Sequence, residues 1–416
     1  MRTKNVVILC LSLASMYGTL QAQIPAQTSQ IDSPSAMSFI IQGHIQGLML
    51  GDTLCFERVT MPGFHLDVAF EVIVEKQNEF IYNGRHEDVE YYMMSYKPAL
   101  GEPIGSDRHG MTMLIKEGTT RLIGTADQIY YCQLEGGLYD NEALQEALQL
   151  DNSLGKERGN YMRLIDEAQA AKDTEKVQEY SDKFNSFHAD RQEDFKKLSR
   201  LNSEFYAKFP SSDHTIVDAL GRVNSASFET SLSKYEKMNS EAQNSYFGKI
   251  LKNEIEKMRV LQPGNAAPDF HLIAIDGREI TLGDCAGSYV LIYHWGMCPG
   301  SLMIEAEFTN LYNKHKDNLI VIGVTDSIEQ IKAVYDGTPS GSKFMDLELK
   351  PVLENMLAHP WFDAEKTGNN GKIETDYAFA GLPYFVFISP DGKILARDFQ
   401  RAFYVAKNTL ESEFGN

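Results

Sequence analysis

Hydrophobic and polar positions along the chain follow three patterns in turn. Between residues 38 and 136, short runs of alternating apolar and polar residues recur at close spacing, separated by Gly, Pro, Asn and Asp. This pattern is typical of short strands joined by turns. It predicts an antiparallel, all-β, sandwich-like domain over residues 38–136, in which QIYYCQLEG (residues 128–136) is the last strand.

From residue 137 to residue 261 the alternation stops, and apolar residues recur at three- and four-residue spacing. This spacing predicts several amphipathic helices. Pro210, followed by Ser211 and Ser212, predicts the end of one helix and the N-cap of the next. We interpret residues 137–261 as a helical connector that packs and spaces the domains on either side.

Beyond the break at Gln262-Pro263-Gly264, strands and helices alternate. YVLIYHW (residues 289–295) and NLIVIGVT (residues 318–325) are continuous apolar runs, as expected of strands buried on both faces. Pro390-Asp391-Gly392 separates two later apolar runs and predicts an antiparallel hairpin. Residues 262–416 are therefore predicted to form an α/β domain with a mixed sheet flanked by helices.

The first 22 residues are typical of a secretory signal peptide. Arg2 and Lys4 precede the apolar run Val6–Ala14, and small or polar residues follow up to Ala22. We expect cleavage after Ala22 and export to the periplasm or cell envelope, with the polar residues 23–37 as a flexible linker. The apolar run is too short to span a bilayer and no later run reaches about 18 residues, so no transmembrane span is expected.

Composition excludes some classes of partner. The 416 residues include 39 Lys and Arg against 58 Asp and Glu, a formal net charge of −19. This excess of negative charge repels phosphate backbones and anionic lipid head groups, so neither a nucleic acid nor a membrane surface is an expected partner. Five cysteines are too few for a disulfide scaffold in a chain of this length.

Each cysteine therefore needs its own interpretation. Cys10 lies inside the signal peptide and is expected to leave with it. Cys55 and Cys132 fall on predicted strands of the β domain, where we expect two separate buried thiols, with a disulfide between them as the alternative. Cys285 precedes the apolar strand at residues 289–295 and is expected to be a loop or core thiol.

Cys298 lies where that buried strand has ended and the next helix begins. Pro299 suits the first helical position, because its missing N–H has no intrahelical partner there. The free backbone N–H groups and the positive end of the helix dipole stabilise a negatively charged sulfur, which would make Cys298 a nucleophile. The alternative is a small apolar cysteine at a loop end.

The segment from about Gly264 onward resembles the thioredoxin-fold domain of TlpA/ResA-like thiol–disulfide oxidoreductases, which are related to the AhpC/TSA family. The resemblance rests on Gly264–Phe270, Ile275–Gly277, Ile280–Leu282, Cys298–Ser301 and Gly381–Pro383 followed by YFVFISPDGKIL. Residues 38–136 more weakly resemble an N-terminal β domain of unknown function that precedes such domains in secreted bacterial proteins.

The resemblance implies a site and its chemistry. It implies a cis Pro383 lying against Cys298, which leaves the backbone of Leu382 to pair with an extended peptide. The implied catalytic residues are Cys298 and Ser301, and the implied substrate-binding residues are Pro299, Gly300, Leu382 and Pro383.

The sequence also departs from the family pattern. Ser301 replaces the second cysteine, so a local dithiol–disulfide cycle is impossible. Met297 stands where the family usually carries an aromatic residue, and Ile292 where thioredoxins carry a buried carboxylate. Cys285 cannot supply the missing thiol, because a strand of seven residues at ~3.3 Å each separates it from Cys298 by about 20 Å.

His294 and the insertion at residues 336–377 are weaker candidates. A protonated His294 would stabilise a negative charge on Cys298, although a histidine in an apolar strand is more often packed and neutral. The aromatic residues at 359–362 are expected to form a local core under a long loop, with a substrate rim as the alternative. No Cys-x-x-Cys or His-x-x-x-His pair exists and no cofactor is expected.

Three hypotheses follow. The first is thiol–disulfide exchange on envelope proteins by a monothiol Cys298, through a mixed disulfide that an external thiol reductant clears. The second is a redox-inactive module that uses the same fold to bind a peptide or partner. The third is a one-cysteine peroxidase, which is disfavoured because Trp295 and Leu291 stand where the peroxidase motif Pro-x-x-x-Thr-x-x-Cys has Thr and Pro.

Overall fold

The computed structural model describes residues 36–61, 65–101, 110–274, 277–296, 298–325, 361–363 and 372–415, together with residues 333 and 336. The predicted signal peptide, almost all of the predicted linker, Met297 and most of the insertion lie outside the described residues. The chain divides into two compact units. One holds residues up to Gly221 with Lys234–Ile250, and the other holds Arg222–Ser233 with Leu251–Asn416.

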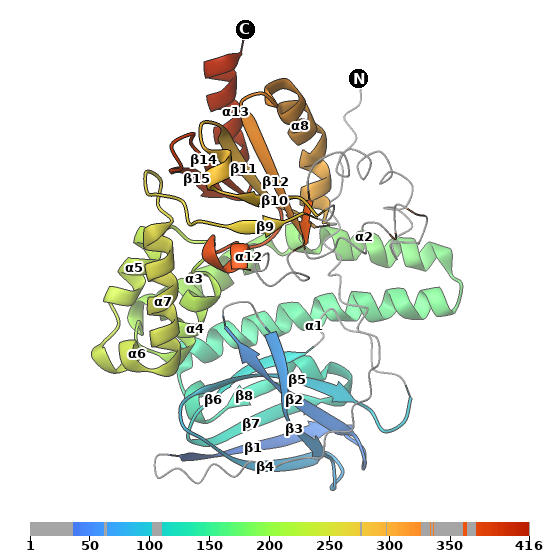
Figure 1. Ribbon diagram of the computed structural model, residues 1–416. Helices are drawn as coiled ribbons and strands as arrows, with labels where there is room; N and C mark the ends of the chain where they lie inside the picture. The colour runs from blue at the N-terminus through green and yellow to red at the C-terminus, as the bar shows by residue number, and fades with distance from the viewer. Residues whose placement is uncertain are drawn as a thin grey trace. The chain divides into compact units, whose positions relative to one another are not determined.

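Two four-stranded sheets form the β-rich part of the first unit (Figure 1). Their strand orders are β4-β1-β7-β8 and β3-β2-β5-β6. The strands are β1 Met37–Gln46, β2 Thr53–Thr60, β3 His65–Ile73, β4 Glu79–His86, β5 Glu90–Lys97, β6 Met111–Ile115, β7 Gly118–Thr125 and β8 Gln133–Glu135. Burial alternates along β1, and Ile41 shares one apolar core with Leu54 and Phe56 of the other sheet, as the sequence pattern predicts.

Two details of this β-rich part differ from the prediction. β1 pairs antiparallel with β4 but parallel with β7, which the long connection through β2–β6 permits. In the predicted last strand at residues 128–136, the first four residues belong to a 3-10 helix, η1 (Ala126–Tyr131), and only β8 is a strand. Ile129 and Tyr131 are buried from this helical turn, so their apolar character did not indicate a strand.

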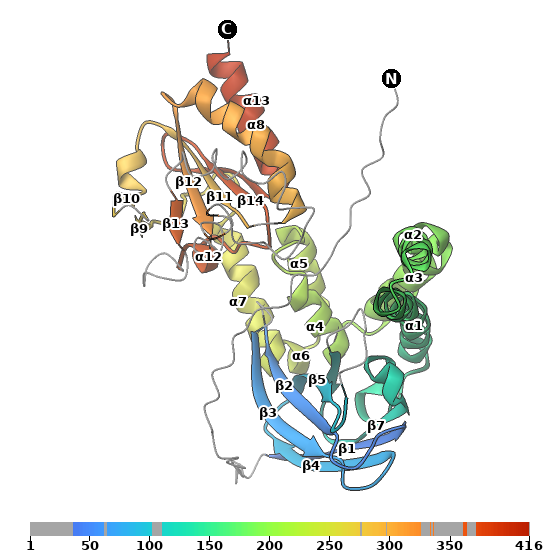
Figure 2. The same cartoon turned by 90° about the vertical axis from the view of Figure 1, so that its right-hand side faces the viewer.

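Among the described residues, seven α-helices follow β8 in the segment predicted to be helical. They are α1 Glu142–Ala170, α2 Thr174–Asp190, α3 Gln192–Lys208, α4 Asp213–Gly221, α5 Phe228–Glu236, α6 Ser240–Asn244 and α7 Tyr246–Val260. α1, α2 and α3 pack together. Figure 2 shows these three helices in a view nearly along their axes. The predicted break at Pro210 is confirmed, because Ser212 Oγ accepts a hydrogen bond from Thr215 N (3.2 Å) at the start of α4.

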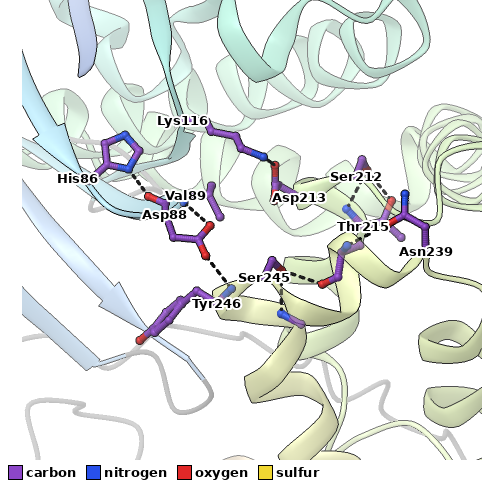
Figure 3. Close-up of polar contacts among 12 residues, drawn as sticks. His86, Asp88, Val89, Lys116, Ser212, Asp213, Thr215, Asn239, Ser245 and Tyr246 are labelled. Atoms are coloured by element: carbon purple, nitrogen blue, oxygen red, sulfur yellow. Dashed lines mark hydrogen bonds and ion pairs between the residues drawn. The ribbon is translucent and has the colours of Figure 1, made fainter. Parts of the chain in front are cut away.

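Asp88, between β4 and β5, connects the sheets to these helices (Figure 3). Its Oδ2 accepts a hydrogen bond from the backbone N of Tyr246, the first residue of α7, at 2.8 Å, and its Oδ1 accepts one from Val89 N at 2.7 Å. A second link pairs Lys116 Nζ with Asp213 Oδ2, at the start of α4, at 3.3 Å. A carboxylate at a helix N-terminus satisfies a free N–H group and complements the helix dipole.

The second unit contains a five-stranded mixed sheet of order β13-β12-β11-β14-β15. β11 runs parallel to β12 and antiparallel to β14, and β14 and β15 form the predicted antiparallel pair. The strands are β11 Tyr289–His294, β12 Leu319–Thr325, β13 Trp361–Asp363, β14 Tyr384–Ile388 and β15 Ile394–Asp398, and β9 His271–Ile273 pairs with β10 Glu279–Thr281 in a separate hairpin.

Both faces of the mixed sheet are covered, which explains the continuous apolar runs. Leu291 and Tyr293 of β11 face α8 (Pro299–His315) and α13 (Gln400–Phe414), which lie beside the sheet in Figure 1. Val290 and Ile292 face a second core that includes β9 and α12 (Lys372–Asp376). None of the described helices is long and apolar enough to cross a membrane.

The contact of Asp88 with α7 predicts a measurable stability effect. Asp88→Ala removes the acceptor at the first N–H of the helix and should lower the free energy of unfolding by about 1 kcal/mol. Urea unfolding followed by circular dichroism measures it. Glu87→Ala is the matched control, because Glu87 is the exposed neighbouring carboxylate and should change stability by less than about 0.5 kcal/mol. Equal effects of the two substitutions would contradict a capping role.

Candidate active site

Cys298 is the N-cap residue of α8. Its backbone is extended (φ −101°, ψ 156°), Pro299 opens the helix, and the backbone N–H of Ser301 donates a hydrogen bond to Cys298 Sγ over 3.4 Å. The side chain is partly exposed to solvent. The prediction that the sulfur lies at the start of this helix is therefore confirmed, and a backbone N–H of the first turn points at it.

Ser301 lies directly behind the sulfur. Its side chain is completely buried, and its Oγ lies 3.3 Å from Cys298 Sγ. The backbone N–H of Gly296 points at the same oxygen over 3.5 Å, which leaves the hydroxyl proton able to turn toward the sulfur. The thiol can donate to Ser301 Oγ, and once the thiol has lost its proton the hydroxyl can donate to the sulfur instead.

The loop at Leu382 and Pro383 closes the other side of the sulfur. The Leu382–Pro383 peptide bond is cis, as the resemblance implied. Cys298 Sγ lies 3.7 Å from the carbonyl oxygen of Leu382, within reach of a weak S–H···O hydrogen bond. A Cβ added to Gly300 would lie 2.9 Å from Pro383 Cδ, so the absence of a side chain at Gly300 permits the close approach of loop and helix.

The structure thus brings Cys298, Gly300, Ser301, Leu382 and Pro383 together. Pro299 lies between Cys298 and Gly300 in the chain, at the first helical position of α8. The roles assigned to these residues from the sequence remain predictions. The geometry allows sulfur chemistry at a helix N-terminus, beside a loop whose Leu382 carbonyl oxygen lies near the sulfur and whose Leu382 side chain is exposed.

His294, the last residue of β11, contacts other partners than the sequence suggested. Its Nδ1 lies 3.3 Å from the carbonyl oxygen of Gly381, and its Nε2 lies 3.0 Å from Glu374 Oε1, a contact that is an ion pair when the ring is protonated. The ring also stacks on Phe379, with the ring centroids 4.8 Å apart. The predicted influence of His294 on Cys298 stays a prediction.

The other three described cysteines are also free thiols. Cys285 ends the 3-10 helix η3 (Gly283–Cys285) before β11, and its thiol donates a hydrogen bond to Thr281 O (3.4 Å). Burial is the main reason that the pKa of the Cys285 thiol is raised to about 11. Cys285 lies before β11 and Cys298 lies after it, so the six residues of this strand stand between the two cysteines.

The β-rich unit carries no disulfide between its two cysteines. Cys55 lies on β2, and burial, together with the charges of Glu57 and Glu71, raises the pKa of its thiol to about 11. Cys132 follows η1 and is fully buried, and that burial raises the pKa of its thiol to about 12. The expectation of two separate thiols is confirmed, but only Cys132 is buried, Cys55 is partly exposed, and Cys132 lies outside any strand.

Glu305, one turn beyond Ser301 on α8, is a buried carboxyl that the sequence analysis missed. Only 1% of its surface is exposed. Oε1 accepts a hydrogen bond from Thr309 Oγ1 (3.1 Å), and Oε2 has no hydrogen-bond partner among the described residues. Burial raises the pKa of Glu305 to about 7. The sequence signal that could have indicated its burial is its position between Ile304 and Phe308, on the apolar face of the helix.

Glu305 also acts on its neighbour Tyr293. Burial raises the pKa of the Tyr293 phenol, and the charge of Glu305 adds to that effect. The Tyr293 hydroxyl donates to the carbonyl oxygen of Ser301 (3.4 Å), so these groups form one buried polar cluster behind the sulfur. Within the described part of the chain, no group of three His, Cys, Asp or Glu side chains is arranged to hold a metal ion.

Comparison with known proteins places this site in a family context. Residues 263–348 match the model of the AhpC/TSA family. None of the curated proteins compared matches the chain. The predicted resemblance is thereby confirmed for the C-terminal part of the chain, which has a thioredoxin-like α/β fold, preceded by the β-rich sheets and the helices.

Solved structures that resemble the chain include two from Bacteroides. The thioredoxin domain of a thiol-disulfide oxidoreductase from Bacteroides vulgatus is 21% identical, with 36% of this chain and 98% of that chain covered and a TM-score of 0.27. A thiol:disulfide interchange protein from a Bacteroides species is 22% identical, with 38% and 93% covered and a TM-score of 0.28.

The raised pKa of Glu305 predicts a pH-dependent stability. The folded chain holds this proton up to about pH 7, whereas an unfolded glutamate releases it near 4.5. The stabilisation is complete below pH 4.5 and is lost as the pH rises to 7, by up to about 3 kcal/mol. Glu305→Gln should remove this slope in urea titrations from pH 4.5 to 8.

Glu307→Gln is the matched control for that experiment. Glu307 lies on the same helix, is exposed, and pairs with Lys407 at 3.1 Å. Its replacement should leave the decline of stability between pH 4.5 and 7 in place. An unchanged slope in Glu305→Gln would show that another group carries the pH dependence.

Proposed function

We propose that the protein performs thiol–disulfide exchange on polypeptides through Cys298 alone. The observation that carries this proposal is the position of Cys298 Sγ, held by the Ser301 N–H (3.4 Å), 3.3 Å from the Ser301 hydroxyl and 3.7 Å from the Leu382 carbonyl oxygen. The sulfur is partly exposed and is oriented by a backbone N–H of the first helical turn, so a substrate disulfide can reach it.

The exchange proceeds in two steps. The Cys298 thiolate attacks one sulfur of a substrate disulfide, so that a mixed disulfide forms and the other substrate sulfur leaves as a thiolate, which then takes up a proton. In the second step a thiolate from outside the chain attacks the substrate sulfur of the mixed disulfide, so that a disulfide forms between that thiol and the substrate and Cys298 leaves as a thiolate. Ser301 can donate a hydrogen bond to the Cys298 thiolate, but an alcohol cannot expel the substrate.

We also propose that the protein acts after export, in the periplasm or the cell envelope. The support is the charged, apolar and small-residue order of residues 1–22, which is typical of a signal peptide. Its substrates would then be envelope proteins that carry thiols or disulfides, and its reductant an external thiol.

The second candidate function is a redox-inactive module that binds a peptide at the same loop. Ser301 favours it, because the position of the second sulfur of a dithiol site is filled by a fully buried hydroxyl. The two functions differ in whether a bound peptide ever becomes covalently attached to Cys298.

Trapping the mixed disulfide distinguishes them. Incubation with a peptide disulfide should give one peptide adduct at Cys298, detected by mass spectrometry without reductant, and Cys298→Ala should abolish it. Cys285→Ala is the matched control, because the Cys285 thiol is buried and lies before β11, whereas Cys298 lies after it. A peptide that binds equally well to wild type and Cys298→Ala, with no adduct, would support the binding module. Sulfenic acid formed by peroxide faster than any adduct would support a peroxidase.

Restoring a second sulfur should change the outcome of exchange. In Ser301→Cys the new Sγ replaces an oxygen 3.3 Å from Cys298 Sγ, close enough for a disulfide after a small shift. We expect an internal disulfide and a mixed disulfide that decays at least tenfold faster without added thiol. Ser301→Ala, the control, keeps one sulfur and should retain the long-lived adduct. An equally persistent adduct in Ser301→Cys would contradict the proposed limit on turnover.

A further inference from the structure

His294 lies at a junction of three segments in the second unit. It ends β11, its Nδ1 faces the carbonyl oxygen of Gly381 at 3.3 Å, and its Nε2 faces Glu374 Oε1 of α12 at 3.0 Å. The side chains of His294 and Glu374 are 12% and 35% exposed. Both contacts are therefore largely shielded from water, where ion pairs are screened less than at the surface.

The chemistry of the imidazole ring makes the two contacts cooperative. Both ring nitrogens face oxygen acceptors, and each contact is favourable only when its nitrogen carries a proton. The Glu374 carboxylate lies against Nε2, and the carbonyl oxygen of Gly381 lies against Nδ1, so each contact favours the ring orientation that the other needs. Phe379 stacks on the ring with an interplanar angle of 19°, which limits rotation away from either partner.

The Gly381 carbonyl belongs to the loop that faces the sulfur. The next residue, Leu382, places its carbonyl oxygen 3.7 Å from Cys298 Sγ, and Pro383 packs against Gly300. His294 therefore holds the loop from the side of β11, while Gly300 holds it from the side of α8. The His294 contact adds to the packing of Pro383 on Gly300 and to the pairing of β14 with β11, which begins at Tyr384.

We infer that His294 and Glu374 are positioning residues that hold the Leu382–Pro383 loop for recognition of polypeptide disulfides. The inference rests on the proposed exchange function and adds a distinction between substrates. A polypeptide must align its backbone with the loop as well as its sulfur with Cys298, whereas a small reagent needs the sulfur only. The clamp formed by His294, Glu374 and Gly381 affects the alignment of the polypeptide backbone with the loop.

The test compares two reactions of the same thiol in the full chain. In Glu374→Gln, exchange with a peptide disulfide should slow about tenfold, while alkylation of Cys298 by iodoacetamide should change less than twofold. His294→Leu, which removes both contacts, should slow peptide exchange further. His294→Asn retains an amide donor near the position of Nδ1 and should recover part of the peptide rate relative to His294→Leu.

Glu279→Gln is the matched control. Glu279 pairs with a histidine of the same unit, His271 Nε2 to Glu279 Oε2 at 2.8 Å, in the hairpin of β9 and β10. Its replacement should leave both rates unchanged. Equal slowing of peptide exchange and alkylation in Glu374→Gln, or slowing of neither, would overturn the inference.

A second measurement separates failure of the clamp from failure of the exchange function. If the wild-type chain forms no adduct with any peptide disulfide, the proposed function fails, and hydrogen exchange at the amides of Leu382 and Tyr384 then decides the clamp. Faster exchange at these amides in Glu374→Gln than in Glu279→Gln supports it. Equal protection of the loop in the two variants overturns it.

Discussion

The first turn of α8 holds the sulfur of Cys298 through the backbone N–H of Ser301, and the other parts of the site are arranged around that contact. β11 is buried on both faces and so fixes where the chain leaves the sheet. Pro299 starts the helix there, and Gly300 lets the loop of Pro383 approach. A helix that began one residue later would turn the sulfur away from both the N–H donor and the loop carbonyl.

Local signals explain what the sequence could predict. The apolar run before Cys298 and the proline after it determine a strand end and a helix start within a few residues, so the position of the sulfur follows without tertiary information. The contacts of His294 could not be predicted in this way, since Gly381 lies 87 residues away along the chain. Glu305 is intermediate, because its place on the apolar face of α8 is visible in the sequence but its burial is a tertiary fact.

The β-rich unit shows how the same signals fail. Residues 128–136 are apolar and aromatic, which indicated a strand, yet Ile129 and Tyr131 reach the core from a 3-10 turn. A short apolar run specifies burial more firmly than it specifies backbone conformation. The parallel pairing of β1 with β7 was equally hidden, because strand order depends on which distant segments meet and not on the pattern within either one.

For the proposed exchange, the hydroxyl of Ser301 changes how a bound polypeptide can be released. In a dithiol site a neighbouring thiolate can end the mixed disulfide, but a single sulfur must wait for a thiol from solution. The lifetime of the adduct then depends on how firmly noncovalent contacts hold the polypeptide and how far they shield the Cys298 sulfur. The proposed function assigns those contacts to the Leu382–Pro383 loop, which His294 contacts from the side of β11 and Gly300 from the side of α8. With serine at position 301, the release of a polypeptide would therefore depend on the contacts of the loop and not on a second sulfur. A pure binding module is the limit in which no covalent step occurs.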